Sequence, residues 1–355
     1  MDKVEELLTR GVSEILPTND ELKKLLKSGK KLRVYMGFDP TSPQLHIGHL
    51  VGLRKLKQWQ ELGHEVIFLI GDFTARIGDP SGKNETRPKL EKEVVEENAK
   101  EYKKQAGKIL KFDGDNPVKI RFNSEWLDPM TAYNFVSLAS ETTFVQIIER
   151  DMFQKRIKTG KNLSLQEILY PLIQGYDSVA MDVDVEVGGH DQLFNMMMGR
   201  HLMRKLKGKD KFVMTLPLLT DKEGNKIGKT SGNAVALTDT PTMIFGDIMS
   251  IPDNVIYDSL LCMTDISIEK KESINKAMIQ GENPVQFKKL LAFEVVKQLH
   301  GEEAAKKAQE DFENTFSKGQ IPQDVPTIKI KEASVELVDF LVDNNLAPSK
   351  SEAKR

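Results

Sequence analysis

Two histidines, separated by an isoleucine and a glycine, occupy residues 46–49, where a predicted strand gives way to a predicted helix. A helix N-terminus offers free N–H groups and a positive dipole end, which suit a phosphate. Gly48 lets a nucleotide approach the backbone closely. The imidazoles of His46 and His49 can donate hydrogen bonds to charge that develops on a phosphate. Because four-residue matches also arise by chance, a role in capping the helix would explain the same histidines.

Two further loops carry cations that suit a polyphosphate. In Ile77-Gly78-Asp79-Pro80-Ser81-Gly82-Lys83, followed by Arg87, the two cations can bind pyrophosphate oxygens and Asp79 can receive an ammonium or a hydroxyl group. In Lys226-Ile227-Gly228-Lys229-Thr230, two lysines three residues apart, with a hydroxyl beside them, can clamp a leaving pyrophosphate. Taken singly, each loop is better explained as a solvated turn.

The rest of the sequence narrows the class of protein. It contains no Walker loop and no dinucleotide-binding glycine motif. The single cysteine, Cys262, rules out an intrachain disulfide framework and a cysteine-based zinc site. A net charge of −2 argues against a polybasic binder, though not against a local basic face. The N-terminus lacks an apolar signal region and the longest apolar run, Val66–Ile70, is too short to span a membrane. We therefore expect a cytoplasmic protein without a membrane partner.

The elements that would position these loops follow a βαβ pattern. Residues 32–38 and 65–70 read as buried strands, and 48–62 has leucines and a tryptophan at helical spacing. Such strands run parallel with a right-handed crossover, and ligands bind at their carboxyl ends. The loops at 38–48 and 71–83 should therefore open side by side.

The pattern continues and then changes. Further strands are predicted at 183–187 and 212–219 with a helix at 164–179, whereas about 240–316 reads as amphipathic helices only. The prediction is an α/β fold, in which a Rossmann-like parallel-sheet catalytic domain is followed by an all-α domain. The boundaries are 1–220 with an insertion near 113–165, a mobile lysine loop at 221–235, helices at 236–330, and a last piece at 331–355.

The chain resembles bacterial tyrosyl-tRNA synthetases, which are class I aminoacyl-tRNA synthetases, over nearly its whole length. Residues 46–49 match the nucleotide signature of that family, and 226–230 match its Lys-Met-Ser-Lys-Ser signature with Gly228 and Thr230 in place of the serines. The segment from Tyr170 to Asp177 is similar to the tyrosine-binding helix, and 188–192 match another family loop, in which His190 has no assigned role.

The resemblance implies a tyrosine site. Positions 170, 174 and 177 share one helix face because they lie four and three residues apart. Tyr170, Gln174 and Asp79 are implied at the ammonium group, and Gln192 near the amino acid. Asp177 and Tyr35 are implied as the partners of the phenolic hydroxyl.

The resemblance also implies the chemistry. The tyrosine carboxylate attacks the α-phosphate of ATP, giving tyrosyl-adenylate and pyrophosphate, and tRNA(Tyr) then accepts the tyrosine. Catalysis would rest on positioning and charge stabilisation. The residues implied as catalytic are His46, His49, Thr41, Lys83, Arg87, Lys226 and Lys229. Those implied for ATP binding are Gly37, Asp39, His46, Gly48, His49, Asp191, Lys229 and Thr230. Mg²⁺ is expected to arrive with ATP, without a dedicated protein site.

Two expectations concern assembly. A homodimer formed through the insertion is implied by the family. Residues 331–355 resemble the beginning of an S4-type RNA-binding domain, so the sequence predicts a shortened chain that activates tyrosine but charges tRNA weakly.

Three alternatives remain. A small-molecule nucleotidyltransferase would keep the residue 46–49 turn without needing the 170–177 helix. A synthetase-like RNA-binding protein without catalysis predicts damaged signatures, whereas both histidines and both lysines are present. A tryptophan enzyme would share the fold, but Tyr35 with Asp177 favours a phenol over an indole.

Overall fold

The chain folds into two compact units, Met1–Phe312 and Glu313–Arg355. The computed structural model describes residues 2–81, 90–220, 229–230, 233–317, 335–344, 346 and 349–354. Within these ranges, no helix has both the length and the apolar character needed to cross a membrane.

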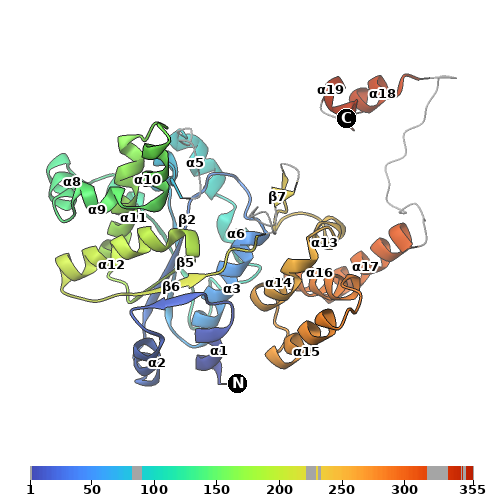
Figure 1. The fold of residues 1–355 in the computed structure, drawn as a ribbon, viewed down its shortest axis with the longest axis horizontal. Helices are drawn as coiled ribbons and strands as arrows, with labels where there is room; N and C mark the ends of the chain where they lie inside the picture. The colour runs from blue at the N-terminus through green and yellow to red at the C-terminus, as the bar shows by residue number, and fades with distance from the viewer. Residues whose placement is uncertain are drawn as a thin grey trace. The chain divides into compact units, whose positions relative to one another are not determined.

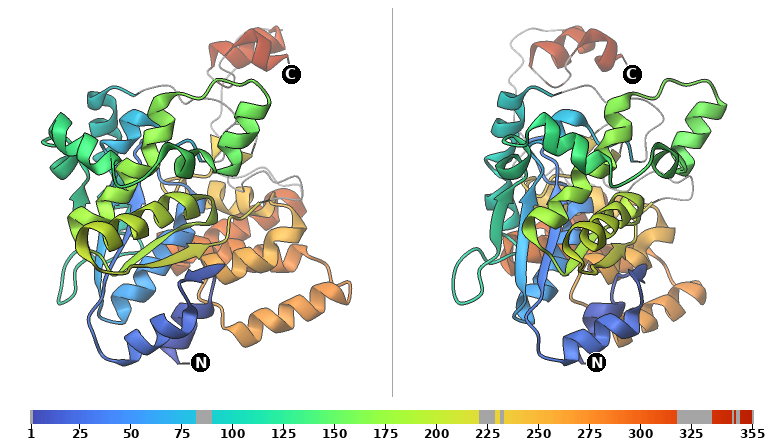
Figure 2. Two further views of the ribbon diagram at one scale, coloured as in Figure 1. Left: turned by 60° about the vertical axis from the view of Figure 1, so that its left-hand side comes forward. Right: turned by 90° about the vertical axis from the view of Figure 1, so that its left-hand side faces the viewer.

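A six-stranded sheet forms the middle of the first unit, in the order β1-β6-β5-β2-β3-β4 (Figure 1). Strands β2 to β6 pair in parallel, and β1 is antiparallel to β6 at the edge. The strands are β1 (Glu14–Leu16), β2 (Arg33–Phe38), β3 (Glu65–Ile70), β4 (Lys119–Phe122), β5 (Val185–Gly189) and β6 (Phe212–Leu216). A mostly parallel sheet needs cover on both faces, and helices lie on both sides of it (Figure 2).

The helices of the first unit fall into three groups. Those of the amino-terminal half are α1 (Lys3–Thr9), α2 (Asn19–Lys27), α3 (Ile47–Glu61), α4 (Thr74–Ile77), α5 (Lys92–Ala99), α6 (Tyr102–Ala106) and α7 (Ser124–Leu127). Next come α8 (Ala132–Ala139), α9 (Phe144–Ile148), α10 (Asp151–Lys158), α11 (Leu165–Met181) and α12 (Leu193–Lys207). The last group is α13 (Pro241–Met249), α14 (Ile256–Met263), α15 (Ile268–Ile279), α16 (Val285–His300) and α17 (Glu302–Phe312).

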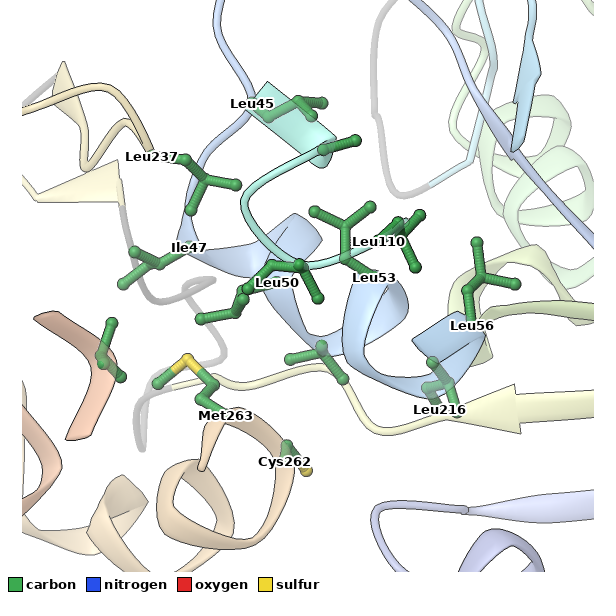
Figure 3. Close-up of a cluster of buried hydrophobic side chains, with 14 of the residues drawn as sticks. Leu45, Ile47, Leu50, Leu53, Leu56, Leu110, Leu216, Leu237, Cys262 and Met263 are labelled. Carbon is green, nitrogen blue, oxygen red and sulfur yellow. The ribbon is translucent and has the colours of Figure 1, made fainter. Parts of the chain in front are cut away.

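Alternate residues of the central strands enter different cores, as the two-residue period of a strand requires. Val34 and Phe38 belong to the main core, which also contains the leucines of α3. Tyr35 points to the opposite face, where it clusters with Ile67 and Leu69. Figure 3 shows Leu50, Leu53 and Leu56 of α3 in a buried cluster with Leu216 of β6, Leu237 from the turn before α13, and Cys262 and Met263 of α14. One continuous core therefore joins the sheet to the helical region.

The predicted βαβ unit is confirmed, since β2, α3 and β3 lie within two residues of the expected bounds and the two strands pair in register from Arg33–Glu65 to Phe38–Ile70. The helix at 164–179 and the strands at 183–187 and 212–219 are also present as α11, β5 and β6. The predicted fold class, a parallel-sheet α/β part followed by helices, is confirmed.

Two strands differ from the prediction. Strand β1, between α1 and α2, was not among the strands predicted from the sequence. The proposed insertion at 113–165 contains β4, which extends the main sheet beside β3. Both strands are short edge strands. β4 alternates charged and apolar residues, and Phe122 is 37% exposed, so neither strand carries the apolar run that marks a central strand.

The second unit is small. It contains α18 (Leu337–Asp343) and α19 (Lys350–Ala353), both within the last piece predicted at 331–355.

Candidate active site

A cavity of about 560 Å³ opens at the carboxyl ends of β2, β3 and β5. Every predicted site residue whose side chain the structure describes lines it: Tyr35, Gly37, Asp39, Thr41, His46, Gly48, His49, Asp79, Tyr170, Gln174, Asp177, Asp191 and Gln192. Lys83, Arg87 and Lys226 lie outside the described residues, and Lys229 and Thr230 are described only as strand β7 (Lys229–Thr230). The loops expected to open side by side therefore do so.

The histidine turn caps α3. The Nδ1 atom of His46 accepts from the Gly48 N–H at 3.1 Å, and the Nδ1 atom of His49 accepts from the His46 N–H at 3.0 Å. A Cβ atom at position 48 would lie 2.9 Å from the His46 ring, so glycine is needed there. When Nδ1 of a neutral imidazole accepts a hydrogen bond, the proton resides on Nε2. The capping role and the donor role are therefore compatible, because the cap fixes the tautomer that donates through Nε2.

Backbone pairing holds the residues after the lysine loop against this turn. The Ile47 N–H donates to Val235 O at 3.0 Å, and the Leu237 N–H donates to Leu45 O at 2.8 Å. His46 and Ala236 form an antiparallel bridge between them. Strand β7 pairs with β8 (Asn233–Ala234) only a few residues earlier. The segment that follows the second lysine is thus tied to the start of α3.

One end of the cavity collects hydrogen-bond acceptors. Asp79 accepts from Gln192 Nε2 at 2.7 Å and from the Ser81 N–H at 2.9 Å. The buried Asn195 amide donates to Gln174 Oε1 at 3.0 Å and to Gln192 Oε1 at 2.9 Å. A carboxylate and two amide oxygens held in this way suit an ammonium group, which only donates.

Asp39 and Tyr170 join this end to the nucleotide side. The Tyr170 hydroxyl donates to Asp39 Oδ2 at 2.8 Å, and the Thr74 hydroxyl donates to Asp39 Oδ1 at 2.7 Å. A Cβ atom at Gly71 would lie 2.0 Å from Asp39 Oδ1, so glycine makes room for the carboxylate. Burial, followed by the charges of Asp39 and Asp79, raises the pKa of Tyr170 well above its usual value. Its phenol therefore stays a donor.

The other end of the cavity carries Tyr35 and Asp177, as predicted, but the two have separate supports. The Tyr35 hydroxyl bonds Ser178 Oγ at 2.9 Å. Asp177 accepts from Trp126 Nε1 at 2.8 Å and from Asn123 Nδ2 at 3.3 Å. Burial raises the pKa of Asp177 well above its usual value, although the bonds from Trp126 and Asn123 oppose the shift. A hydroxyl placed between the two side chains would meet a carboxyl and a phenol.

Several supporting residues were not predicted from the sequence. Asn123 and Trp126 follow β4, so recognising that strand would have placed them at the carboxyl edge of the sheet. Arg150 donates to Ser81 Oγ at 2.6 Å beside Asp79, and no motif marks it. No sequence motif marks Thr74, Ser178 or Asn195 either. Among the described residues, no group of three or more His, Cys, Asp and Glu side chains is arranged to hold a metal ion.

Solved structures share this fold. A C-terminally truncated mitochondrial tyrosyl-tRNA synthetase from Aspergillus nidulans superposes with a TM-score of 0.74 at 22% identity, covering 88% of this chain and 94% of its own. A tyrosyl-tRNA synthetase from Archaeoglobus fulgidus, complexed with L-tyrosine, gives 0.67 at 24% identity, covering 87% and 100%. The chain therefore shares the fold of these two proteins.

The sequence relatives identify the family more specifically than the solved structures do. A tyrosine–tRNA ligase of Thermotoga maritima is 46% identical over 99% of this chain and 86% of its own length. One of Aquifex aeolicus is 45% identical over 98% and 87%. Residues 27–317 match the family of tRNA synthetases class I (W and Y), and the chain belongs to that family. These relatives confirm the predicted resemblance and the enzyme class predicted from it.

Proposed function

We propose that this chain activates L-tyrosine with ATP to form tyrosyl-adenylate and pyrophosphate, and then transfers the tyrosyl group to tRNA(Tyr). The observation that carries the proposal is the polarity of one cavity. It has acceptors at the Asp79 end and a phenol beside a carboxyl group, Tyr35 and Asp177, at the other. L-tyrosine has a matching ammonium group and hydroxyl at its two ends. The names of the relatives support the same substrate.

In this arrangement Asp79, Tyr170, Gln174 and Gln192 bind the ammonium group and the phenol lies against Tyr35 and Asp177. The substrate carboxylate then faces the turn that caps α3. A carboxylate oxygen attacks the α-phosphorus of ATP, and the bond from that phosphorus to the pyrophosphate oxygen breaks. No side-chain nucleophile is required, because holding the two reactants together removes most of the entropic barrier.

The nucleotide lies along the start of α3. The Nε2–H groups of His46 and His49 donate to charge that develops on the phosphates, and Thr41 lies beside them. Gly37 and Gly48 admit the nucleotide close to the backbone, with Asp39 and Asp191 near its ribose. The cations Lys83, Arg87, Lys226 and Lys229, with Thr230, hold the pyrophosphate. Mg²⁺ enters with ATP and supplies charge neutralisation on the phosphates.

Tryptophan is the nearest competing substrate within the family. The indole N–H only donates a hydrogen bond, so it could satisfy Asp177 but could not accept a hydrogen bond from the Tyr35 hydroxyl. A phenolic hydroxyl both donates and accepts, and it can satisfy both groups. This difference favours tyrosine.

The test is pyrophosphate exchange with tyrosine, with tryptophan and without an amino acid. We expect exchange only with tyrosine, and a fall of at least a hundredfold in its rate for His49→Ala while tyrosine still binds. His201→Ala is the matched control, because His201 bonds Glu141 O outside the cavity. Normal exchange in His49→Ala, or exchange that depends on tryptophan, would contradict the proposal.

The proposal includes a homodimer located in the cytoplasm, where translation uses charged tRNA. Support for the dimer comes from helices α8 and α9, which expose a cluster of large apolar side chains. These are Tyr133, Val136, Phe144 and Val145, with exposed fractions of 59–82%. Exposed apolar patches of this kind mark interaction surfaces.

A further inference from the structure

A buried ion pair lies at the phenol end of the cavity, which Glu186 lines. Lys211, directly before β6, and Glu186, on β5, have side-chain exposures of 0% and 4% and contact each other. Removing two charges from water costs about as much as their attraction returns, and apolar residues of similar size often stabilise a protein equally well. Stability alone therefore gives little reason for this pair.

Apart from Glu186, which lines the cavity itself, the pair connects to the site through the Ser178 hydroxyl. Lys211 Nζ donates to Ser178 Oγ at 2.8 Å, and Ser178 Oγ lies 2.9 Å from the hydroxyl oxygen of Tyr35. Ser178 belongs to α11 and directly follows Asp177. A chain of three hydrogen-bonding groups thus runs from a buried ammonium to the wall of the cavity.

The donor and acceptor capacity of each group gives this chain a direction. A lysine ammonium only donates, and a serine hydroxyl has one proton. Ser178 must accept from Lys211, so its proton goes to Tyr35 at 2.9 Å or to Glu186 Oε2 at 3.3 Å. The Glu186 oxygen already receives a proton from Lys211, and the Tyr35 contact is shorter. Donation along the shorter contact, from Ser178 to Tyr35, would leave the phenolic proton of Tyr35 for the cavity.

We propose that Lys211 and Glu186 are positioning residues that orient the Ser178 hydroxyl, so that Tyr35 donates to the phenolic oxygen of the substrate and selects a ring bearing a hydroxyl group. This inference rests on the proposed function, in which tyrosine places its phenol against Tyr35 and Asp177. The substrate hydroxyl accepts from Tyr35 and donates to Asp177. Phenylalanine does neither, so the phenolic proton of Tyr35 would lack an acceptor and Asp177 would lack one donor.

The packing around the pair fits this role. Gly199 of α12 faces it, and a Cβ atom there would lie 2.5 Å from Lys211 Nζ and 2.8 Å from Ser178 Oγ. The close approach of α12 thus leaves room only for the ammonium. Burial raises the pKa of Tyr35 well above its usual value, so its phenol keeps the proton that it donates. Burial lowers the pKa of Lys211, and the neighbouring Glu186 carboxylate opposes that shift.

Two variants test the proposal. Ser178→Ala removes the connection and keeps the ion pair, whereas the double variant Glu186→Leu with Lys211→Met removes both charges together, so that neither is left buried alone. Each is assayed by pyrophosphate exchange with tyrosine and with phenylalanine. In both, we expect the KM for tyrosine to rise about tenfold, which corresponds to one lost hydrogen bond. The ratio of kcat/KM for tyrosine to that for phenylalanine should fall by a similar factor, with the KM for ATP within twofold of wild type.

Lys209→Gln is the matched control. Lys209 lies two residues from Lys211 but forms partly exposed ion pairs with Asp182 and Asp184. The KM for tyrosine and the tyrosine-to-phenylalanine ratio of kcat/KM should therefore stay at their wild-type values in this variant. A merely structural role for Lys211 would lower activity with both amino acids equally. An unchanged tyrosine-to-phenylalanine ratio in both variants would overturn the inference. Wild-type protein without tyrosine-dependent exchange would instead overturn the proposed function itself.

Discussion

Asp177 lies in surroundings that disfavour its own charge. Burial raises its pKa in the folded protein above the ordinary value of 3.8. Between those two pKa values the folded chain holds a proton that the unfolded chain has released. The contribution of this group to the free energy of unfolding therefore decreases as pH rises through that window, by at most about 1.4 kcal/mol per pH unit. This loss of unfolding free energy is the consequence of placing a carboxyl group in a buried position beside the substrate hydroxyl.

Asp177→Asn should consequently stabilise the protein and damage the enzyme. We expect its free energy of unfolding to exceed that of wild type by about 1–3 kcal/mol at neutral pH, with the difference growing from pH 5 upward until the raised pKa is passed. The KM for tyrosine should rise at least tenfold, since an amide replaces the carboxyl group that accepts from the substrate hydroxyl. Urea unfolding at several pH values and pyrophosphate exchange measure the two effects.

Asp182→Asn is the control for this substitution, because Asp182 ends the same helix in an exposed position. It should change neither quantity. If the difference in unfolding free energy between wild type and Asp177→Asn did not depend on pH, the carboxyl group would not be titrating as described.

Individual site residues could be predicted only where they lie in a segment that resembles a motif of the family. Tyr35, Gln174 and Asp177 were identified because the resemblance covers their segments. Asn123 and Trp126, which hold Asp177, come from a different stretch of the chain and reach it only through the tertiary fold. Sequence spacing contains no information about such contacts, so the supports of a site are harder to predict than its contact residues.

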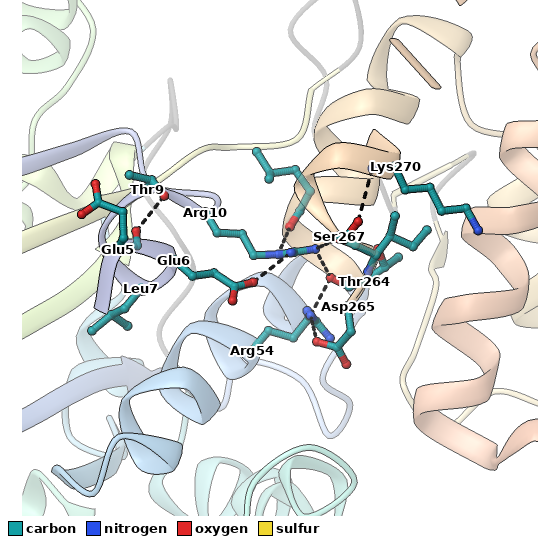
Figure 4. A network of polar contacts seen from close by, with 12 residues as sticks. Glu5, Glu6, Leu7, Thr9, Arg10, Arg54, Thr264, Asp265, Ser267 and Lys270 are labelled. Carbon is teal, nitrogen blue, oxygen red and sulfur yellow. Dashed lines mark hydrogen bonds and ion pairs between the residues drawn. The ribbon is translucent and has the colours of Figure 1, made fainter. Parts of the chain in front are cut away.

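At the scale of elements, α3 is joined to the carboxyl-terminal helices by a network of buried arginines (Figure 4). Arg54 of α3 donates to Thr264 O at 2.6 Å and bonds Asp265 at 2.5 Å. Arg10 donates to Leu261 O, Thr264 O and Ile266 O at 2.6–3.1 Å. The last carbonyl groups of a helix lack partners within it, and here the arginines bond carbonyl groups at and just beyond the end of α14. The helix that carries the histidine turn is thereby fixed to the helical region.

Arg54→Met should loosen this junction. We expect a loss of about 2–4 kcal/mol in the free energy of unfolding, because a buried carbonyl loses a charged donor. Amide hydrogen exchange should accelerate in α14 to α16 more than in the central strands. Lys57→Met, on the same helix, breaks only an exposed ion pair with Glu61 and should cost less than about 0.5 kcal/mol. Equal acceleration in sheet and helices would argue against a local junction.

Elements were predictable in proportion to their burial. The central strands β2 and β3 are apolar along almost their whole length because both faces are covered, and their bounds were found within two residues. β1 and β4 lie at the two edges of the sheet, where half the surface is solvated and a short strand resembles a loop. An edge strand of this kind forms by pairing with the adjacent strand, so its own residues do not predict it.

At the scale of the whole molecule, the exposed apolar cluster on α8 and α9 predicts self-association. Phe144→Glu should convert the proposed homodimer to a monomer at micromolar concentration, because a charge at a twofold interface is buried twice. Sedimentation velocity would measure this change. Ile279→Glu is the matched control, since Ile279 is 78% exposed at the end of α15 and lies outside the cluster. If the dimer persisted in Phe144→Glu but not in Ile279→Glu, the interface would lie in the helical region and not on α8 and α9.

The amino-terminal segment has its partners far along the chain. β1 pairs with β6, where Thr215 bonds Glu14 across 201 residues, and Arg10 bonds Thr264 across 254. A ribosome adds about 5–20 residues per second, so the first strand waits roughly 10–40 s, and Arg10 roughly 13–50 s, before these partners have been synthesised. During that time α1 has native partners only in elements made soon after it, α2 and α3 among them. The segment that completes the edge of the sheet and the arginine junction is therefore made first, but it completes its native contacts late in synthesis, after residue 264 has been added.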